Sequence, residues 1–506
     1  FTQIVLNRST GKYEVKIHKL SSVSGEPPLQ RHKNNDGIHS ILKEAPMLAI
    51  LLDAQYNEKN HKNNLNSHNM ELDTKNDSEQ KNYQIESLPL PTGMRFATMI
   101  HKYAKLHEEA ADMYQHNPEI YERQIRESSI WRLVSALWGS PSDSKGAPIG
   151  YFSSTLNLGG NCSKRTHLLR RRLAIIAWLR ETISKSMKDK DASTSWEALT
   201  RLDVLGACKI ALTQKNTRLA SLLSQSTGRQ LLRSSMADQM KVWSNLKNTS
   251  IDLQRAYLLL SGELDNELLR VEGITWFQDF ALRLCYNGGT NEDKCTTSDA
   301  VKLGLKSYER AFKKKPQPTA VTPFVSNIGK HLDLRYLLLK LECLSENETN
   351  VTAKDCLKTK GFTSNPMDHA LVWHLYQSMK SIEMHKRDIT RSQKAWLTID
   401  EEHWLTSNYS AQLENVGLWH WSIYVANHLP DEERRGHRIR SILFRNCPSL
   451  ESSSFEEIQT FNERKHFLVQ NINIDPAYFY RARVQRARYD HVHSAPNKQE
   501  YADMAD

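Results

Sequence analysis

The residues best suited to chemistry in this 506-residue chain are a few histidines, and their spacing does not build a reactive site. His101 and His107 lie near two glutamates, a combination that could in principle bind zinc. At helical spacing these side chains point in different directions, so we expect no metal site there. His369 and His374 are five residues apart and off a shared helix face. Because His374 falls on the apolar side, a hydrogen-bonded core histidine is the simpler interpretation.

Signature motifs of nucleotide-binding and hydrolytic enzymes are missing from the sequence, which contains no GxxxxGK[ST], GxGxxG, HExxH or GxSxG. The seven cysteines form no CxxC pair and are odd in number, which argues against a disulfide framework and a structural zinc site. Only Cys162 has basic neighbours that could activate it. We therefore expect a non-enzymatic protein with no catalytic, cofactor-binding or metal-binding residues, and reduced thiols.

Clustered basic residues are the one feature that could bind an anionic ligand. A basic run spans 164–172, and the net charge of the chain is +10. A basic α-helical solenoid that binds nucleic acid is therefore the alternative function, although a solvated basic face is the simpler interpretation. The second group of arginines consists of Arg434, Arg435, Arg438, Arg440, Arg481, Arg483, Arg486 and Arg488.

The first twenty residues have a β-hairpin pattern that differs from the rest of the chain. Ile4, Val5 and Leu6 form a short apolar run, turn residues follow, and Tyr13, Val15 and Ile17 then alternate with polar residues. This alternation predicts two strands with one apolar face. Because an isolated two-stranded hairpin is not stable in water, it must dock on its own helices or add to the sheet of another protein.

The remainder of the chain predicts one amphipathic helix after another, without a fixed repeat length. A helix is expected at 37–52, a disordered insertion at about 53–87, and a helix at 367–384 opened by Asn365-Pro366. No apolar run reaches the roughly 18 residues of a membrane span. Because the chain starts at Phe1 rather than Met, we expect a trimmed fragment. Each apolar stripe is most simply core, and a partner-binding surface is the second interpretation, as for Leu232, Met236, Met240 and Trp243.

An ordered set of segments resembles the helical domain of nucleoporin-96, called nucleoporin 145C in fungi, the carboxy-terminal product of the nucleoporin-98/96 precursor. The most specific segments are NPMD at 365–368 followed by LVWHL at 371–375, and YSAQLENVGLWHW at 409–421. Others are SIWRLVSALWG at 129–139, RRLAIIAWL at 171–179, LASLLSQ at 219–225 and YERAF at 308–312. No single segment is unique to the family, but the ordered set is highly specific.

The resemblance implies a mainly α fold, an irregular folded-back α-helical solenoid of the ancestral coatomer type with a trunk and a crown. It implies a short N-terminal β-blade at 1–30, first trunk helices at 31–165, a crown at 166–345 and returning trunk helices at 346–506. The blade would insert into a Sec-thirteen β-propeller through Ile4, Val5, Leu6, Tyr13, Val15 and Ile17. The crown would pack on nucleoporin-107 (nucleoporin 84 in fungi) through residues such as Leu232, Met236, Met240 and Trp243.

The implied function is structural: a scaffold nucleoporin of the Y-complex coat, together with other Y-complex nucleoporins. It would reside at the nuclear pore complex in the nuclear envelope and support pore assembly, mRNA export and protein import. Two departures from the family are expected. The family blade has about three strands, and the strand before Phe1 is missing here. The family also continues past this C-terminus as a helical tail, which is absent here.

Overall fold

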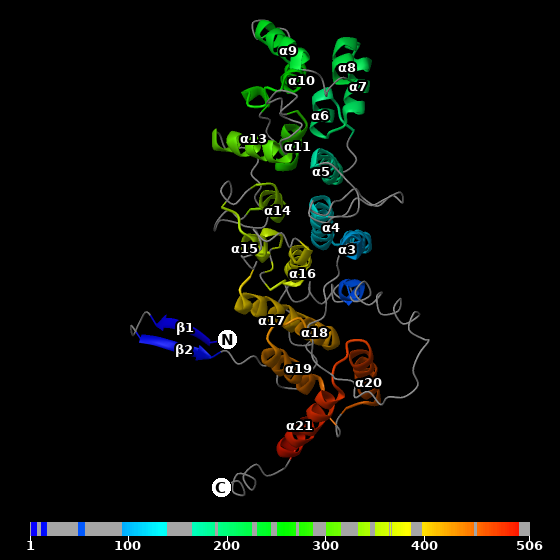
Figure 1. Cartoon of the computed structure of the whole chain (residues 1–506), viewed down its shortest axis with the longest axis vertical. Helices are drawn as coiled ribbons and strands as arrows, with labels where there is room; N and C mark the ends of the chain where they lie inside the picture. Colours follow the sequence, from blue (N-terminus) through cyan, green and yellow to red (C-terminus); the bar gives the residue numbers. More distant parts are fainter. Residues whose placement is uncertain are drawn as a thin grey trace.

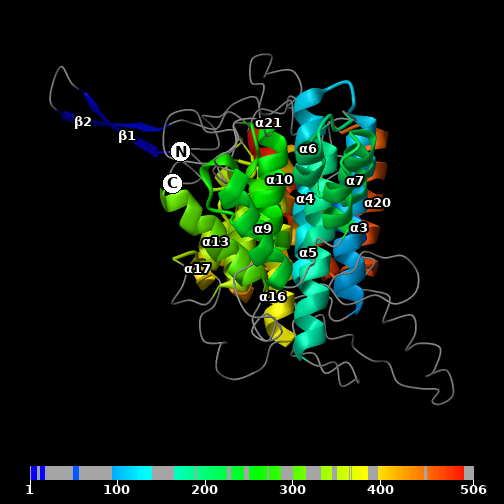
Figure 2. The same cartoon turned by 90° about the horizontal axis from the view of Figure 1, so that it is seen from above.

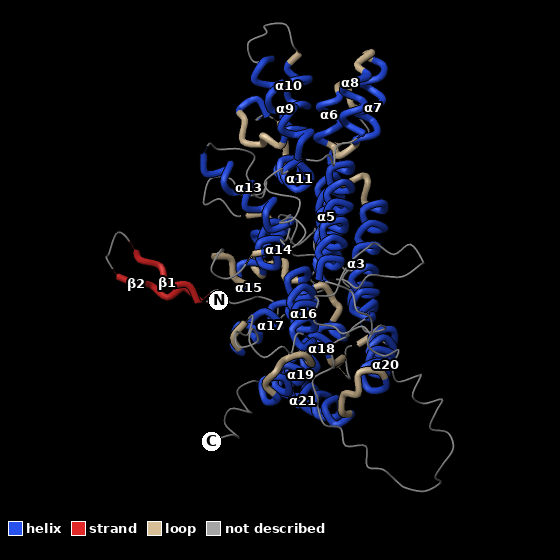
Figure 3. The backbone as a smooth tube through the Cα atoms, turned by 45° about the horizontal axis from the view of Figure 1, so that its top comes forward, coloured by secondary structure: helices blue, strands red, loops and turns tan. Residues whose placement is uncertain are grey.

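The computed structural model describes most of the helical chain and two short N-terminal strands. The described residues are 2–7, 12–17, 49–55, 94–138, 164–187, 191–224, 230–243, 250–269, 273–286, 300–314, 332–344, 350–363, 365, 367–385, 397–449 and 453–494. Strands β1 (Thr2–Asn7) and β2 (Lys12–Ile17) pair antiparallel, with Ile4 opposite Val15 and Leu6 opposite Tyr13. All other regular elements in these ranges are helices, which confirms the predicted mainly α class (Figure 3).

The helices fall into an outgoing series, a turn and a returning series. The outgoing helices are α3 (Met94–Met113), α4 (Pro118–Trp138), α5 (Lys164–Ser186), α6 (Ser195–Thr200), α7 (Val204–Thr213) and α8 (Thr217–Ser224). The turn consists of α9 (Gln230–Trp243) and α10 (Ile251–Ser261). The returning helices are α11 (Trp276–Tyr286), α13 (Ala300–Lys314), α14 (Leu334–Cys343), α15 (Ala353–Cys356), α16 (Ala370–His385), α17 (Ile399–Asn415), α18 (Trp419–Ala426), α19 (Glu432–Asn446), α20 (Phe455–Gln470) and α21 (Pro476–Ser494).

The chain therefore folds back on itself, and its two passes stand side by side (Figures 1 and 2). Helix α5 contacts α11, α4 contacts α14, and α6 contacts α11, so each of these pairs joins an outgoing to a returning helix. Helices α17 to α21 extend the stack beyond the start of the outgoing pass (Figure 1). Among the described residues, no helix is both long enough and apolar enough to cross a membrane.

Local sequence signals explain several helix ends. Thr398 and Ser454 each begin a helix with a reciprocal capping box, in which the glutamate three residues later bonds back to the cap. Gly262 ends α10 with a backbone φ of 81°, and Gly417 follows α17 with a φ of 80°. Because such left-handed conformations favour glycine, the two glycines explain why α10 and α17 end where they do.

Two hydrophobic cores hold together the helices that the structure describes. The larger core draws on helices α3 to α5 and on most helices from α11 to α21, and it buries large aromatic side chains such as Trp131, Trp373 and Tyr409. The smaller core is built from 196–286 and consists mainly of Leu, Ala and Met. Cys285 packs against both cores. Helices α5, α13 and α14, which lie within the predicted crown range, pack into the larger core.

Three predicted boundaries differ from the structure. The helix predicted at 367–384 begins at Ala370, because the carboxylate of Asp368 accepts from the Ala370 amide and ends the preceding turn. The helix predicted to end at 52 continues to 55, so the predicted insertion does not begin at 53. Residues 56–87 of that insertion lie outside the described residues.

Candidate functional site

A buried ionic cluster joins the outgoing pass to the returning pass. Arg123 on α4 donates to Glu127 at 2.9 Å and to Asp368, before α16, at 2.5 Å. Asp368 is fully buried and also accepts from Gln412 on α17 at 3.3 Å. Buried charges are stable only when paired and hydrogen-bonded, so this cluster fixes one relative position of α4, α16 and α17.

His107 on α3 extends this cluster. Its Nδ1 lies 2.6 Å from the side-chain oxygen of Gln124 and 3.3 Å from a carboxylate oxygen of Glu127. Because both neighbours are acceptors, Nδ1 carries the proton. Burial lowers the pKa of His107, and the Glu127 charge only partly offsets that effect. His107 is therefore a neutral donor that ties α3 to the cluster.

A second buried chain of hydrogen bonds runs through His374 on α16. Its Nδ1 lies 3.2 Å from the Tyr103 hydroxyl, and its Nε2 lies 3.3 Å from the Tyr409 hydroxyl. Tyr103 donates to Gln55 at 3.3 Å. The consistent assignment has Nδ1 donating to Tyr103 and Tyr409 donating to Nε2, with His374 neutral. The prediction that His374 is a hydrogen-bonded core histidine is confirmed.

A third cluster ties the first three outgoing helices together. Glu108 on α3 accepts from Arg132 on α4 at 2.7 Å and from Lys185 on α5 at 2.7 Å. Burial alone would raise the pKa of Glu108, but the hydrogen bonds from Arg132 and Lys185 lower it to about 2. Glu108 therefore bonds to α4 and α5, whereas the neighbouring His107 bonds to Gln124.

These polar clusters hold elements together, and none is arranged like a metal or nucleophile site in the part of the chain that is described. No group of three His, Cys, Asp or Glu side chains there is placed to bind a metal ion. Burial raises the pKa of Cys285 to about 11 and that of Cys356 still further, which makes these thiols poor nucleophiles. Cys162 lies outside the described residues.

The first basic run is largely turned inward where its side chains are described. Arg171 is buried and pairs with Glu342 at 3.1 Å. Arg172 donates to the carbonyl of Leu284 at 3.2 Å. The side chains of 164–170 lie outside the described set. Arg171 and Arg172 therefore bridge outgoing and returning helices and offer no phosphate-binding face.

The residues predicted for partner binding fall into two groups. Met236 and Met240 are buried in the smaller core, whereas the side chains of Leu232 and Trp243 lie outside the described set. The predicted blade residues Ile4, Val5, Leu6, Tyr13, Val15 and Ile17 lie in β1 and β2, whose backbone pairing alone is described.

Helix α7 presents an exposed apolar face that sequence reasoning missed. Leu205 is 67% exposed and Leu212 is 55% exposed, two turns apart on the same face. The opposite face, with Ala207 and Ala211, packs into the smaller core. The sequence of α7 carried this signal, because its apolar residues lie on both sides of the helix. A helix with two apolar faces can pack against the core with one face and against a second partner with the other.

Comparisons with known proteins agree on one family. A family model described as Nuclear protein 96 matches residues 194–486, more than half of the chain, from α6 into α21. A Drosophila melanogaster protein named nuclear pore complex protein Nup98-Nup96 is 24% identical over 376 residues, which cover 71% of this chain and 17% of that protein. An Arabidopsis thaliana protein named nuclear pore complex protein NUP96 is 27% identical over 309 residues, 56% of this chain and 27% of that protein.

A third relative extends the coverage. A Caenorhabditis elegans protein named nuclear pore complex protein Nup98-Nup96 is 25% identical over 420 residues, which cover 78% of this chain and 21% of that protein. The chain thus spans between 17% and 27% of the length of these three relatives.

Proposed function

Because the chain belongs to the nuclear protein 96 (Nup96) family, we propose that it is a structural scaffold subunit of the nuclear pore complex. The single observation that carries this proposal is the family match over 194–486, which runs through both hydrophobic cores. The folded-back stack with polar clusters between its passes supports the same role, since a helical array of this kind functions through shape and surface. The proposal includes no enzymatic activity and no cofactor.

We propose that the protein resides at nuclear pores in the nuclear envelope and supports pore assembly, mRNA export and protein import. The names of its relatives, which describe nuclear pore complex proteins, support this location. A fluorescently tagged chain should form a punctate rim at the nuclear envelope and exchange there slowly after photobleaching. A diffuse signal, or a signal on chromatin, would refute the location.

Within the pore we place the protein in the Y-complex coat, where its N-terminal hairpin adds to a Sec-thirteen β-propeller. The register pairs Ile4 with Val15 and Leu6 with Tyr13. Directly paired positions belong to one face of a two-stranded ladder, so these apolar positions share a face. A hairpin with one apolar face gains stability by joining a larger sheet, through main-chain hydrogen bonds and apolar burial.

Charge placed on the apolar face of the hairpin tests this insertion. Val15→Glu with Ile17→Glu should abolish co-purification with the propeller and leave the helical stack folded by circular dichroism. The matched control is Glu14→Lys with Lys16→Glu, which alters the alternate positions and should retain binding. Retained binding of the first variant would refute insertion through this face.

We further propose that the smaller core packs on nucleoporin-107, because the resemblance to the family implies this contact for the crown. Met236 and Met240 would support the contact from inside, while the exposed face of α7 with Leu205 and Leu212 would make it. Leu205→Asp with Leu212→Asp should weaken nucleoporin-107 binding at least tenfold without loss of helicity. Unchanged affinity would exclude α7 from the contact.

A further inference from the structure

The arginines at the C-terminal end of the stack sort into engaged and free side chains. Arg434 pairs with Asp400, Arg445 with Glu414, and Arg486 with Asp490. Arg435 is buried, Arg438 donates to Ser410, and Arg483 donates to Asn462. Arg481 and Arg488 on α21 are exposed and have no carboxylate partner among the residues that the structure describes. The positive charges of these two arginines are therefore not neutralised by a carboxylate among the described residues.

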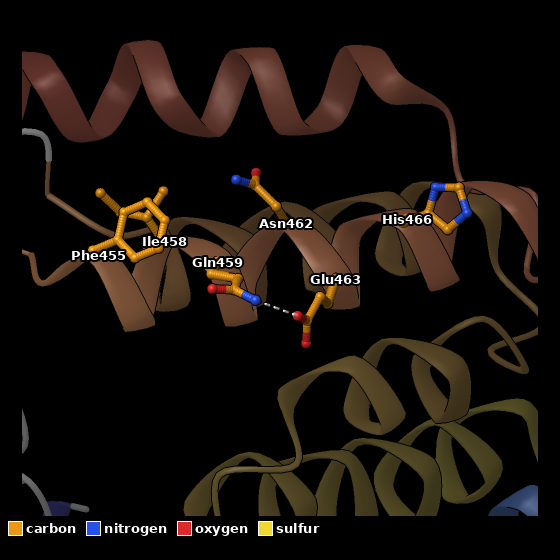
Figure 4. A pocket seen from close by; sticks show the side chains of 6 residues that line it. All are labelled: Phe455, Ile458, Gln459, Asn462, Glu463 and His466. Carbon is orange, nitrogen blue, oxygen red and sulfur yellow. Dashed lines mark hydrogen bonds between the residues drawn. The ribbon is translucent and has the colours of Figure 1, made fainter.

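An apolar hollow lies on helix α20, which contacts α21. The hollow measures about 500 Å³ and follows one face of α20 through Phe455, Ile458, Asn462 and His466 (Figure 4). Phe455 is 80% exposed although it is one of the largest apolar side chains on this surface. From 455 to 466 the helix rises about 16 Å, which is the length of three helical turns.

Helix α21 borders this face of α20. Arg483 donates to Asn462 at 3.4 Å, and the ammonium of Lys465 lies 5.1 Å from the Tyr480 ring. Tyr480 is 61% exposed and Val484 is 52% exposed, one turn apart on the outer face of α21. The hollow with Phe455 and Ile458 is therefore flanked by further exposed apolar side chains from the neighbouring helix.

We propose that the surface formed by the outer faces of α20 and α21 is a docking site for an amphipathic helix of a partner protein that carries carboxylates along one edge. Helices recognise other helices through apolar anchors that recur at one face, as Phe455, Ile458, Tyr480 and Val484 do here. Arg481 and Arg488 are seven residues apart, so they lie about 10 Å apart on one side of α21. Arginine binds carboxylates with two parallel hydrogen bonds, so two acidic residues seven positions apart on the partner would match them.

Exposed carboxylates on α20 favour an amphipathic partner helix over a polyanion such as nucleic acid. Glu456, Glu457 and Glu463 are exposed on α20, and Glu463 accepts from Gln459 at 3.1 Å. Nucleic acid or an anionic membrane that reached Arg481 and Arg488 would also meet these carboxylates and be repelled. A helix with acidic residues along one edge only avoids that repulsion. The site lies at the opposite end of the stack from α7, so it is separate from the contact proposed for the smaller core (Figure 1).

The test uses two designed, hydrocarbon-stapled 18-residue helices with the same leucine face. One carries two glutamates seven residues apart on one edge, and the other carries lysines there. Fluorescence anisotropy with the whole 506-residue chain should show the glutamate helix binding at least tenfold more tightly. Arg481→Glu with Arg488→Glu should reverse that preference, a result that misfolding cannot produce. Phe455→Ala should weaken both helices several-fold.

The matched control is Arg180→Glu with Arg310→Glu, two exposed arginines on α5 and α13, which should change affinity less than twofold. Equal affinity for both helices, or an equal loss in the control, would overturn the proposal. It would also be overturned if phosphatidylserine vesicles or a 20-nucleotide single strand displaced the glutamate helix at comparable concentration. Dimerisation in sedimentation that Arg481→Glu with Arg488→Glu abolishes would overturn it in favour of a second copy of this chain.

Discussion

The two hydrophobic cores of the stack are built in different ways. The larger core combines fully buried aromatic rings such as Trp373 with buried ion pairs such as Arg123–Asp368. The smaller core is mostly Leu, Ala and Met on short helices, and its outer face leaves Leu205 and Leu212 exposed. Buried polar clusters fix one relative position of the helices that they join, because their hydrogen bonds need specific partners. Aliphatic cores that contain methionine can repack against new neighbours. The difference suggests that the larger core forms a rigid spine. The smaller core, at one end of it, forms an adaptable, partner-facing unit.

The largest expected effect comes from breaking the ionic cluster of the spine. Arg123→Met leaves Asp368 and Glu127 buried without their guanidinium, which should lower the free energy of unfolding by about 3–5 kcal/mol. Urea denaturation followed by tryptophan fluorescence measures this loss. Arg310→Met, on an exposed helix surface, is the control and should change stability by less than about 0.5 kcal/mol. A similarly small loss for Arg123→Met would show that the cluster does not fix the spine.

Truncation inside the smaller core should have a large but local effect. Leu259 on α10 is fully buried there, and Leu259→Ala should cost about 3 kcal/mol through lost burial and a cavity. Because the two cores meet chiefly around α11, hydrogen exchange should accelerate in α6 to α10 and hardly change in α16 to α18. Equal acceleration in both regions would mean that the cores form a single cooperative unit.

The junction of the two cores depends on a close approach between helices. A Cβ built on Gly304 of α13 would lie 3.2 Å from the Cα of Leu284 on α11. Gly304→Ala should therefore push these helices apart and cost about 1–3 kcal/mol. Thermal unfolding by calorimetry would report the loss. If Gly304→Ala were neutral, α11 would have room to move, and the two cores would be less tightly joined than this geometry indicates.

Acidification should loosen the spine first. Burial lowers the pKa of His420 to about 3. It also lowers the pKa values of three other histidines: His101, His107 and His369. The unfolded chain therefore binds protons that the folded chain excludes. Stability is then lost as pH falls below the unfolded value of 6.5. Glu108, with a pKa of about 2, adds a further loss below pH 4.5.

His420→Phe separates one contribution from the others. The variant removes the titrating group while keeping the ring contacts with Trp421 and Phe467. Relative to the parent chain, it should lose about 1 kcal/mol less stability between pH 7.5 and pH 5.5. The measurement is urea unfolding at both pH values. An identical pH dependence in both chains would show that His420 is not held neutral by burial.

Sequence reasoning predicted the helical class and the core role of His374, because helical periodicity is a local property. The helix start at Ala370 was missed, since Asp368 accepts from the Ala370 amide while its charge is held by Arg123, some 245 residues earlier in the chain. The exposed face of α7 and the free arginines of α21 depend on which neighbours are present. Which side chains pair across such sequence distances depends on the folded arrangement, and local sequence patterns do not predict that arrangement.

Hydrogen exchange of the chain with and without nucleoporin-107 tests the division into spine and partner-facing unit most directly. We expect slowed exchange in α7 and in the neighbouring helices of the smaller core, with exchange around Trp373 in the spine unchanged. Protection confined to the spine helices, or no protection at all in a formed complex, would contradict it.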